Sequence, residues 1–251
     1  MKRGRVLFPL ALLLIWQGIA GFGLVSPGRL ASPAQVAEGL WELATVGIPP
    51  GYLLHRHIAN SLELVMGGFG LALLVGLPLG IVLGASAAVR GMLGPVLEFF
   101  RPIPPLAWIP LSMLWFGIGF RSAVFLIFLG AFFPILVNTC AGVSTVPTGY
   151  VGVAQVLGAT PRIIWLKVLL PAAVPSILTG ARIGMGIAWM TLVAAEFTGV
   201  QQGYGLGYMI MTARDLQRLD MIMAGMAVIG CLGLLIEQAL SLLSRLLLRW
   251  R

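Results

Sequence analysis

Long, almost uncharged apolar runs recur along this chain and alternate with shorter polar segments. A run must be roughly 20 residues long for an α-helix to cross the hydrocarbon core of a membrane. The pattern gives six candidate spans, at residues 6–24, 64–89, 102–120, 122–146, 172–200 and 221–244. We therefore predict an all-α, polytopic membrane protein with about six transmembrane helices.

The third candidate span differs from the others because prolines crowd its start. Residues 102–110 read Pro-Ile-Pro-Pro-Leu-Ala-Trp-Ile-Pro, which prevents a regular helix there. Irregular backbone at membrane depth is tolerated only where protein shields it or where it lines a cavity. Pro104, Pro105 and Trp108 are therefore candidates for the wall of a translocation path. The alternative is an interfacial loop that becomes helical only after Pro110.

A few polar side chains lie inside the other spans. Asn138 is near the inner end of the fourth span, and the fifth contains Arg182 and Glu196. Too few residues separate these two charges to cross a membrane, so at least one lies within it. Such residues usually face the bundle interior or water. We expect Arg182 to snorkel toward the surface, and the alternative is that it attracts an anionic solute.

The composition agrees with a membrane protein. Of 251 residues, 59% are hydrophobic and 10% charged, whereas a soluble domain is about a quarter charged. The net charge is +8, but the basic residues lie between apolar runs and do not form one patch. That distribution favours control of topology and contact with anionic lipid headgroups over binding to nucleic acid.

Neither the cysteines nor the histidines predict a metal site. Cys140 and Cys231 lie inside apolar runs, so we expect small buried hydrophobic residues and no disulfide. His55 and His57 are two positions apart, which puts them on different faces of a helix. We expect solvated loop residues there.

The segment from residue 26 to residue 60 is more polar and rich in proline. Within it, residues 32–35 read Ser-Pro-Ala-Gln, a capping box with proline at the first helical position. Val36, Leu40 and Leu43 follow at helical spacing. We predict a short amphipathic helix on the outer membrane surface.

Three glycines in the second span recur every four residues. Gly76, Gly80 and Gly84 therefore share one helix face, where small residues let helices approach closely. We interpret them as packing residues.

The basic residues also predict the orientation. Lys2, Arg3 and Arg5 precede the first apolar run, which is either a cleaved signal peptide or a retained span. We favour retention because no clear small-residue cleavage site follows. With the N-terminus inside, the inner side holds twice as many Lys and Arg as the outer side, as expected from the excess of these residues in cytoplasmic loops of membrane proteins. Both termini are then predicted to be cytoplasmic.

The stretch from Gly152 to Pro171 lies between two spans and resembles two helices meeting at a corner. Gly158 suits the left-handed turn that ends a helix. Thr160 suits the cap of the next helix, and Pro161 its first position. Pro171 either stops this second helix or starts the following span. A helix corner at a membrane surface indicates a docking element, and the alternative is an ordinary interhelical loop.

This stretch resembles the cytoplasmic loop of permeases of ABC importers. The family pattern is Glu-Ala-Ala, three residues, Gly, nine residues, Ile, one residue, Leu-Pro. Here Gly152-Val153-Ala154 stands at the first three positions, Gly158 at the glycine and Leu170-Pro171 at the end. Gly152 departs from the pattern, because the family often has glutamate there.

Other segments extend the resemblance over about residues 55–245. They are similar to the permease subfamily for aliphatic sulfonates, taurine, nitrate and bicarbonate. The segments that carry this likeness are residues 101–110, Trp115-Phe116-Gly117-Ile118-Gly119, residues 130–134 and Val193-Ala194-Ala195-Glu196.

The resemblance implies a type I ABC importer permease fold with a cytoplasmic coupling helix. It implies a bacterial inner-membrane subunit, usually a homodimer, that carries a small anionic solute. A solute-binding protein delivers the solute from outside. An ATPase subunit docks on a coupling loop at 148–171 and binds the ATP and magnesium. The coupling residues it implies are Val153, Ala154, Gln155, Leu157, Gly158, Ala159, Thr160, Pro161 and Pro171.

The sequence itself has no nucleotide-binding motif, since no Gly-Lys-Ser/Thr follows the glycines at 203, 205 and 207. We accordingly expect no enzyme activity and no cofactor in this chain. The predicted organisation is an N-terminal helix with an outer segment (1–54), a permease domain (55–245) and a basic tail (246–251). The alternative function is a stand-alone secondary transporter or channel.

Overall fold

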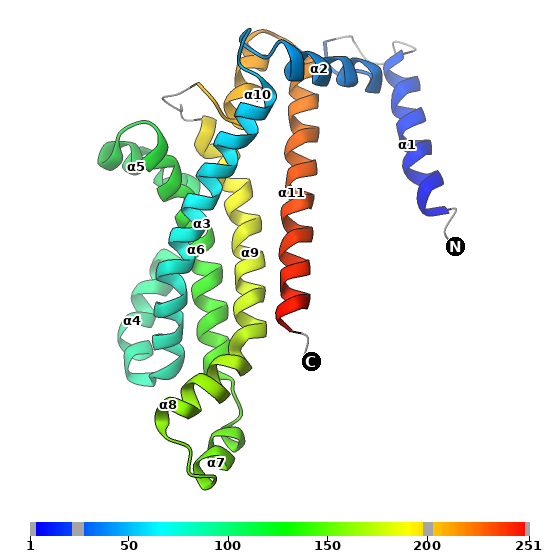
Figure 1. The fold of residues 1–251 in the computed structure, drawn as a ribbon. Coiled ribbons are helices and arrows are strands. Elements are labelled where there is room, and N and C mark those ends of the chain that lie inside the picture. Colours follow the sequence, from blue (N-terminus) through cyan, green and yellow to red (C-terminus); the bar gives the residue numbers. More distant parts are fainter. Residues whose placement is uncertain (1–3, 22–27, 198–202, 249–251) are drawn as a thin grey trace. The chain divides into compact units, whose positions relative to one another are not determined.

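The structure, a computed structural model, describes residues 4–21, 28–197 and 203–248. Every regular element in these ranges is a helix, which confirms the predicted all-α fold (Figure 1). The elements are α1 (Gly4–Gly21), α2 (Pro33–Thr45), α3 (Leu54–Ala85), α4 (Ala87–Phe100), η1 (Pro105–Trp108), α5 (Ile109–Phe116), α6 (Phe120–Ser144), α7 (Thr148–Val156), α8 (Pro161–Ile164), η2 (Trp165–Leu169), α9 (Leu170–Phe197), α10 (Leu206–Asp215) and α11 (Leu219–Leu247).

The apolar helices correspond to the six predicted runs. Four are long and apolar enough to cross a membrane, namely α3, α6, the continuous helix Pro161–Phe197 and α11. Two shorter apolar helices, Ala11–Gly21 and Pro105–Phe116, fall in the first and third runs. The third run contains no single long helix, because its prolines separate α4 from η1 and α5. The predicted inner charges Lys2, Arg3, Arg249 and Arg251 lie outside the described residues.

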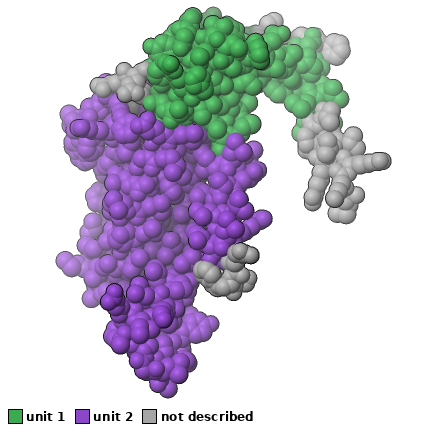
Figure 2. Space-filling model, viewed as in Figure 1, with its two compact units in different colours: residues 1–61, 202–232 green, residues 62–201, 233–251 purple. Residues whose placement is uncertain are grey.

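The chain forms two compact units, which Figure 2 colours separately. Unit 1 contains residues 1–61 and 202–232, and unit 2 contains residues 62–201 and 233–251. Each unit therefore combines segments that are far apart in the sequence.

In unit 2, the glycine face of α3 packs directly on α6. A Cβ atom on Gly80 would lie 2.7 Å from Cβ of Thr139, and one on Gly84 would lie 2.6 Å from Cβ of Val143. Gly76 faces α6 in the same way. These separations are too short for any side chain, so the predicted role of the three glycines in close helix packing is confirmed.

The other side of α6 packs on α9 through glycines of both helices. A Cβ atom on Gly180 of α9 would lie 2.7 Å from Cβ of Asn138, and one on Gly142 of α6 would lie 2.6 Å from Cβ of Ser176. Twelve residues of α6 are buried, more than in any other described helix. Helix α6 is therefore the centre of unit 2.

In unit 1, α2 begins with the predicted capping box. The Gln35 amide N–H donates to Ser32 Oγ at 3.3 Å, and the Ser32 amide N–H donates to Gln35 Oε1 at 2.8 Å. Pro33 is the first residue of the helix. The capping box is thus confirmed, and it fixes where α2 starts.

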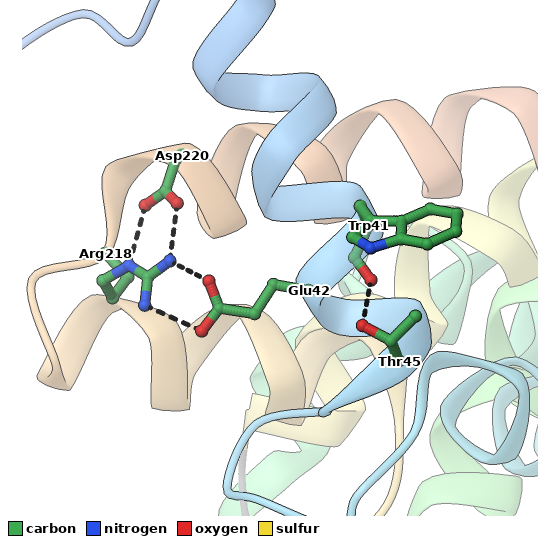
Figure 3. A network of polar contacts seen from close by, with 5 residues as sticks. All are labelled: Trp41, Glu42, Thr45, Arg218 and Asp220. Atoms are coloured by element: carbon green, nitrogen blue, oxygen red, sulfur yellow. Dashed lines mark hydrogen bonds and ion pairs between the residues drawn. The ribbon is translucent and has the colours of Figure 1, made fainter.

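An ion-pair network joins α2 to the start of α11 (Figure 3). The Arg218 guanidinium donates to Glu42 Oε2 at 2.6 Å and to Asp220 Oδ2 at 2.8 Å, with a second hydrogen bond to each carboxylate. Gly39 allows the approach, because a Cβ atom there would lie 3.0 Å from the Asp220 carbonyl carbon. The hydrogen bonds from Arg218 lower the pKa of the Glu42 carboxyl below its ordinary value.

Two predictions about burial are wrong. His57 is fully buried in unit 1, since α3 begins at Leu54 and carries His57 on its inner face. With the imidazole proton on Nε2, Nδ1 accepts from the Gly205 N–H at 3.0 Å and Nε2 donates to the Tyr52 carbonyl at 3.2 Å. Cys231 is an exposed free thiol, because the part of α11 around it lies outside the packed core.

The Arg218 network predicts a pH-dependent contribution to stability. Arg218→Gln should lower the free energy of unfolding by about 1 kcal/mol near neutral pH, because the ion pairs are partly exposed. A carboxyl whose pKa is lowered in the folded state stabilises it fully above its ordinary pKa. That contribution is lost as the pH falls through the folded-state pKa of Glu42. The difference in thermal midpoint between variant and parent should therefore be constant near neutral pH and shrink below about pH 4.

Arg214→Gln is the matched control, since Arg214 pairs only with its exposed neighbour Asp215. We expect almost no change in its midpoint. Thermal unfolding of the purified variants across pH measures both effects. An Arg218→Gln effect that persists unchanged at low pH would show that the network does not stabilise the fold through Glu42.

Candidate functional site

The predicted helix corner is built around Gly158. Helix α7 ends at Val156, and Gly158 adopts φ +77°, in the left-handed region. The Gly158 N–H donates to the Gln155 carbonyl at 2.9 Å, and the Ala159 N–H donates to the Ala154 carbonyl at 3.0 Å. These two bonds form a Schellman motif, which satisfies carbonyls at the end of the helix. The predicted turn at Gly158 is confirmed.

The second helix starts where the sequence places it. Thr160 is the N-cap of α8 with an extended backbone, and Pro161 is its first residue. The Thr160 side chain makes no capping hydrogen bond, so backbone conformation and proline alone determine this start.

Pro171 does not end the second helix. It is the second residue of α9, which continues from α8 through the π-helical turn η2. In that turn the Leu170 N–H donates to the Trp165 carbonyl, one residue further back than in an α-helix. The wider turn makes room for a proline ring, which would clash with the carbonyl of Lys167 in a regular helix. The corner is therefore continuous with a helix that extends to Phe197.

Figure 1 shows α7 and α8 beyond the ends of α6 and α9, all of which belong to unit 2. The outer face of α7 is apolar and exposed. The exposed fraction is 62% for Val153, 88% for Val156 and 81% for Leu157, and Tyr150 is exposed beside them. We call these four residues the α7 patch. Clustered apolar side chains on a short helix outside the packed bundle are typical of an interaction surface.

The other predicted coupling residues surround this patch. The exposed ones are Gln155, Gly158, Thr160 and Pro161, and the half-buried ones are Ala154, Ala159 and Pro171. Gly152, at the family's glutamate position, has open space around its Cβ position.

Three of the six predicted pathway residues meet at one cavity of unit 2. Pro105, Trp108 and Asn138 line a cavity of about 360 Å³ formed by η1, α6 and α9. We call it the Asn138 cavity. Asn138 Nδ2 donates to the Pro134 carbonyl at 2.8 Å, which fixes the orientation of its amide. Pro104, the N-cap of η1, is exposed and does not line the cavity.

Arg182 and Glu196 also do not line this cavity. The guanidinium of Arg182 donates to the Glu237 carboxylate of α11, with one hydrogen bond at 3.2 Å from Nε and a shorter one from Nη2. Glu196 is fully buried in α9. The pairing of Arg182 with Glu237 was not predicted from the sequence. The available signal was that the last predicted span contains one acid, Glu237, and the fifth contains one base, Arg182.

Arg101 is the functional candidate that sequence reasoning missed. It lines the Asn138 cavity and is the only charged residue to do so among the described residues. The sequence signal for this role was that Arg101 directly precedes the proline segment at residues 102–110.

An apolar helical bundle with a cavity and an exposed apolar corner is typical of a membrane transport subunit. Comparison with known proteins identifies its family. Residues 76–250 match the family described as binding-protein-dependent transport system inner membrane component. The chain belongs to this family, and it is therefore a permease subunit of an ABC importer and a component of the inner membrane.

Individual relatives agree with this assignment. The taurine transport system permease protein of Escherichia coli is 42% identical over 243 residues, which cover 95% of this chain and 86% of the relative. The bicarbonate transport system permease protein of Synechococcus elongatus is 37% identical over 258 residues, with 99% and 91% covered.

A solved structure confirms the fold. A chain of the MetNI methionine ABC transporter, in an inward-facing conformation, has a TM-score of 0.68 and 24% identity, and the match covers 79% of this chain and 98% of that one. The predicted ABC importer permease fold is thus confirmed.

The corner predicts a local effect of substitution at Gly158. Gly158→Ala should destabilise the last turn of α7 by about 1 kcal/mol, because a side chain disfavours the left-handed conformation. Hydrogen exchange of the amides of Gly158 and Ala159 should then accelerate roughly fivefold. Gly149→Ala is the matched control, because Gly149 lies in α7 with a negative φ and open space around it. That control should leave exchange unchanged or slow it, and equal acceleration in both variants would contradict the assigned role of Gly158.

Proposed function

We propose that this permease docks a separate ATPase subunit through the α7 patch and imports a small anion delivered by a solute-binding protein. The ATPase subunit binds the ATP and magnesium, and the permease works as a homodimer with both termini in the cytoplasm. The observation that carries the proposal is the α7 patch, an exposed apolar surface joined through the turn at Gly158 to the continuous helix Pro161–Phe197.

The chemistry of α7 supports docking through apolar contact. Val156 and Leu157 are the most exposed members of the patch, and covering them would remove apolar area from water. Gly152 supplies no carboxylate where the family often has one, and its surroundings are open. Recognition of the ATPase then depends on shape and apolar area, without an acidic contact at this position.

The continuity between corner and core supports mechanical coupling. The Schellman motif holds α7 against the start of α8, and α8 continues through η2 into α9. Helix α9 packs closely on α6 at Gly180 and lines the Asn138 cavity with Ile183 and Ile187. A displacement of α7 by the ATPase would therefore move a wall of this cavity, because a packed helix shifts as a rigid body.

The names of the relatives support a small anionic solute, since they are permeases for taurine and bicarbonate. The excess of Lys and Arg in the predicted inner segments supports cytoplasmic termini. The pathway roles of Pro104, Arg182 and Glu196 stay predictions.

The docking proposal is tested by Leu157→Asp. A carboxylate in an apolar interface loses its hydration without gaining a partner, so this variant should retain less than about a tenth of the ATPase subunit during co-purification. Membrane insertion should be unchanged, because Leu157 is 81% exposed.

Leu216→Asp provides a matched control. Leu216 is the C-cap of the short helix α10, as Leu157 is of α7, and it is 58% exposed. This variant should co-purify the ATPase subunit like the parent. Equal recovery of the ATPase subunit with both variants would refute docking through the α7 patch.

The solute class is tested with the partner solute-binding protein. Isothermal titration with taurine, an alkyl sulfonate, nitrate and bicarbonate should show micromolar or tighter binding of one of them. Uptake of that compound into proteoliposomes should require the binding protein, the ATPase subunit and ATP. Binding of only a solute without an oxyanion group, or uptake by the permease alone in an ion gradient, would contradict the proposal.

A further inference from the structure

A second cavity lies beside the Asn138 cavity in unit 2. It measures about 240 Å³ and is formed by α3, α4 and α6. Cys140 lines it, and we call it the Cys140 cavity. The two cavities share three lining residues, Arg101, Phe133 and Val137. Arg101 is the only charged residue in this shared wall.

The charge of Arg101 is not neutralised by an ion pair. Arg182, Arg214 and Arg218 each form a salt bridge with a carboxylate, whereas Arg101 forms none with any residue in the described ranges. Glu98 lines the Cys140 cavity within one helical turn of Arg101, without reaching ion-pair distance of it.

The charged side chains that line each cavity give both cavities a net positive charge. In the Cys140 cavity, Arg90 and Glu98 offset each other, and Arg101 adds one positive charge. In the Asn138 cavity, Arg101 is the sole charge, and the Asn138 amide already donates to Pro134. The walls are otherwise mostly apolar, and such walls strengthen the attraction of a charged group for an oppositely charged solute.

The guanidinium group suits an oxyanion. It presents five N–H donors in a planar fork that matches two oxygens of a carboxylate-like or sulfonate-like group, and it stays protonated at every physiological pH. Arg101 is exposed at the cavity walls, so its donors are accessible to a solute. An oxyanion that enters a cavity can therefore pair with it.

We propose that Arg101 is the charge-selecting residue of the permease and that a small oxyanion contacts it as it moves between the two cavities. The inference deepens the proposed function, on which it rests for the direction and purpose of transport. The attraction of anions by Arg101 stands independently of the ATPase and of the natural solute.

The native thiol at Cys140 allows a direct test of this attraction. In a Cys231→Ser background, Cys140 is the only thiol of the chain. The purified full-length permease, without an ATPase subunit, is treated with either of two methanethiosulfonate reagents, the anionic sulfonatoethyl or the cationic trimethylammonium-ethyl compound. The quantity measured is the ratio of the anionic to the cationic modification rate. Any change in thiol ionisation affects both rates equally and cancels in the ratio.

We expect Arg101→Gln to lower this ratio by about tenfold, because it removes a unit charge from the cavity wall. Arg101→Lys retains the charge and should keep the ratio within about twofold of the parent. Arg121→Gln is the matched control: it removes one arginine charge from the other end of α6, about 28 Å from Cys140 at 1.5 Å per residue. Its ratio should be that of the parent.

Three results would overturn the inference. They are an unchanged ratio in Arg101→Gln, an equal fall in Arg121→Gln, and no reaction of Cys140 with either reagent, which would show that a hydrated ion does not enter the cavity. A helix content by circular dichroism and a size-exclusion profile like those of the parent show that Arg101→Gln is folded. None of these results depends on docking or on the natural solute, so failure here is distinguishable from failure of the proposed function.

Discussion

The close approach of α6 to its two neighbours determines the architecture of unit 2. Glycines at the α3 and α9 contacts bring backbone and Cβ atoms within distances that no larger residue allows. Helices in a membrane gain little from excluding water, so packing of this kind carries much of their association. The cavities lie next to these contacts. Residues of α6 line both cavities, together with residues of α4 in one and of η1 and α9 in the other.

This packing also connects the corner formed by α7 and α8 to the core of unit 2. Residues 161–197 form one continuous helix, in which the π-helical turn η2 accommodates Pro171 without a break. The corner is therefore not an isolated loop. It adjoins a long helix that packs closely on α6. The same helix contributes Ile183 and Ile187 to the wall of the Asn138 cavity, so the proposed docking surface and the cavity wall belong to connected elements.

Electrostatic pairing separates the arginines into two groups. Arg182 and Arg218 have carboxylate partners and hold helices together, at α9–α11 and α2–α11 respectively. Arg101 has no such partner in the described ranges and lies between two cavities. Because a paired guanidinium has little remaining attraction for a solute, Arg101 is a better candidate for contact with an anion than Arg182 or Arg218.

Local patterns in the sequence determined much of this protein: the helical class, the apolar runs, the capping box at Ser32, the glycine face of α3, and the turn at Gly158. Each of these depends on residues within a few positions of one another, whose periodicity and backbone preferences can be read directly. The family resemblance supplied the role of the corner. Only the tertiary structure decided that His57 is buried, that Glu237 neutralises Arg182, and that Arg101 joins Asn138 at a cavity. These facts depend on contacts between distant segments, and no local pattern records which side chains a folded bundle brings together.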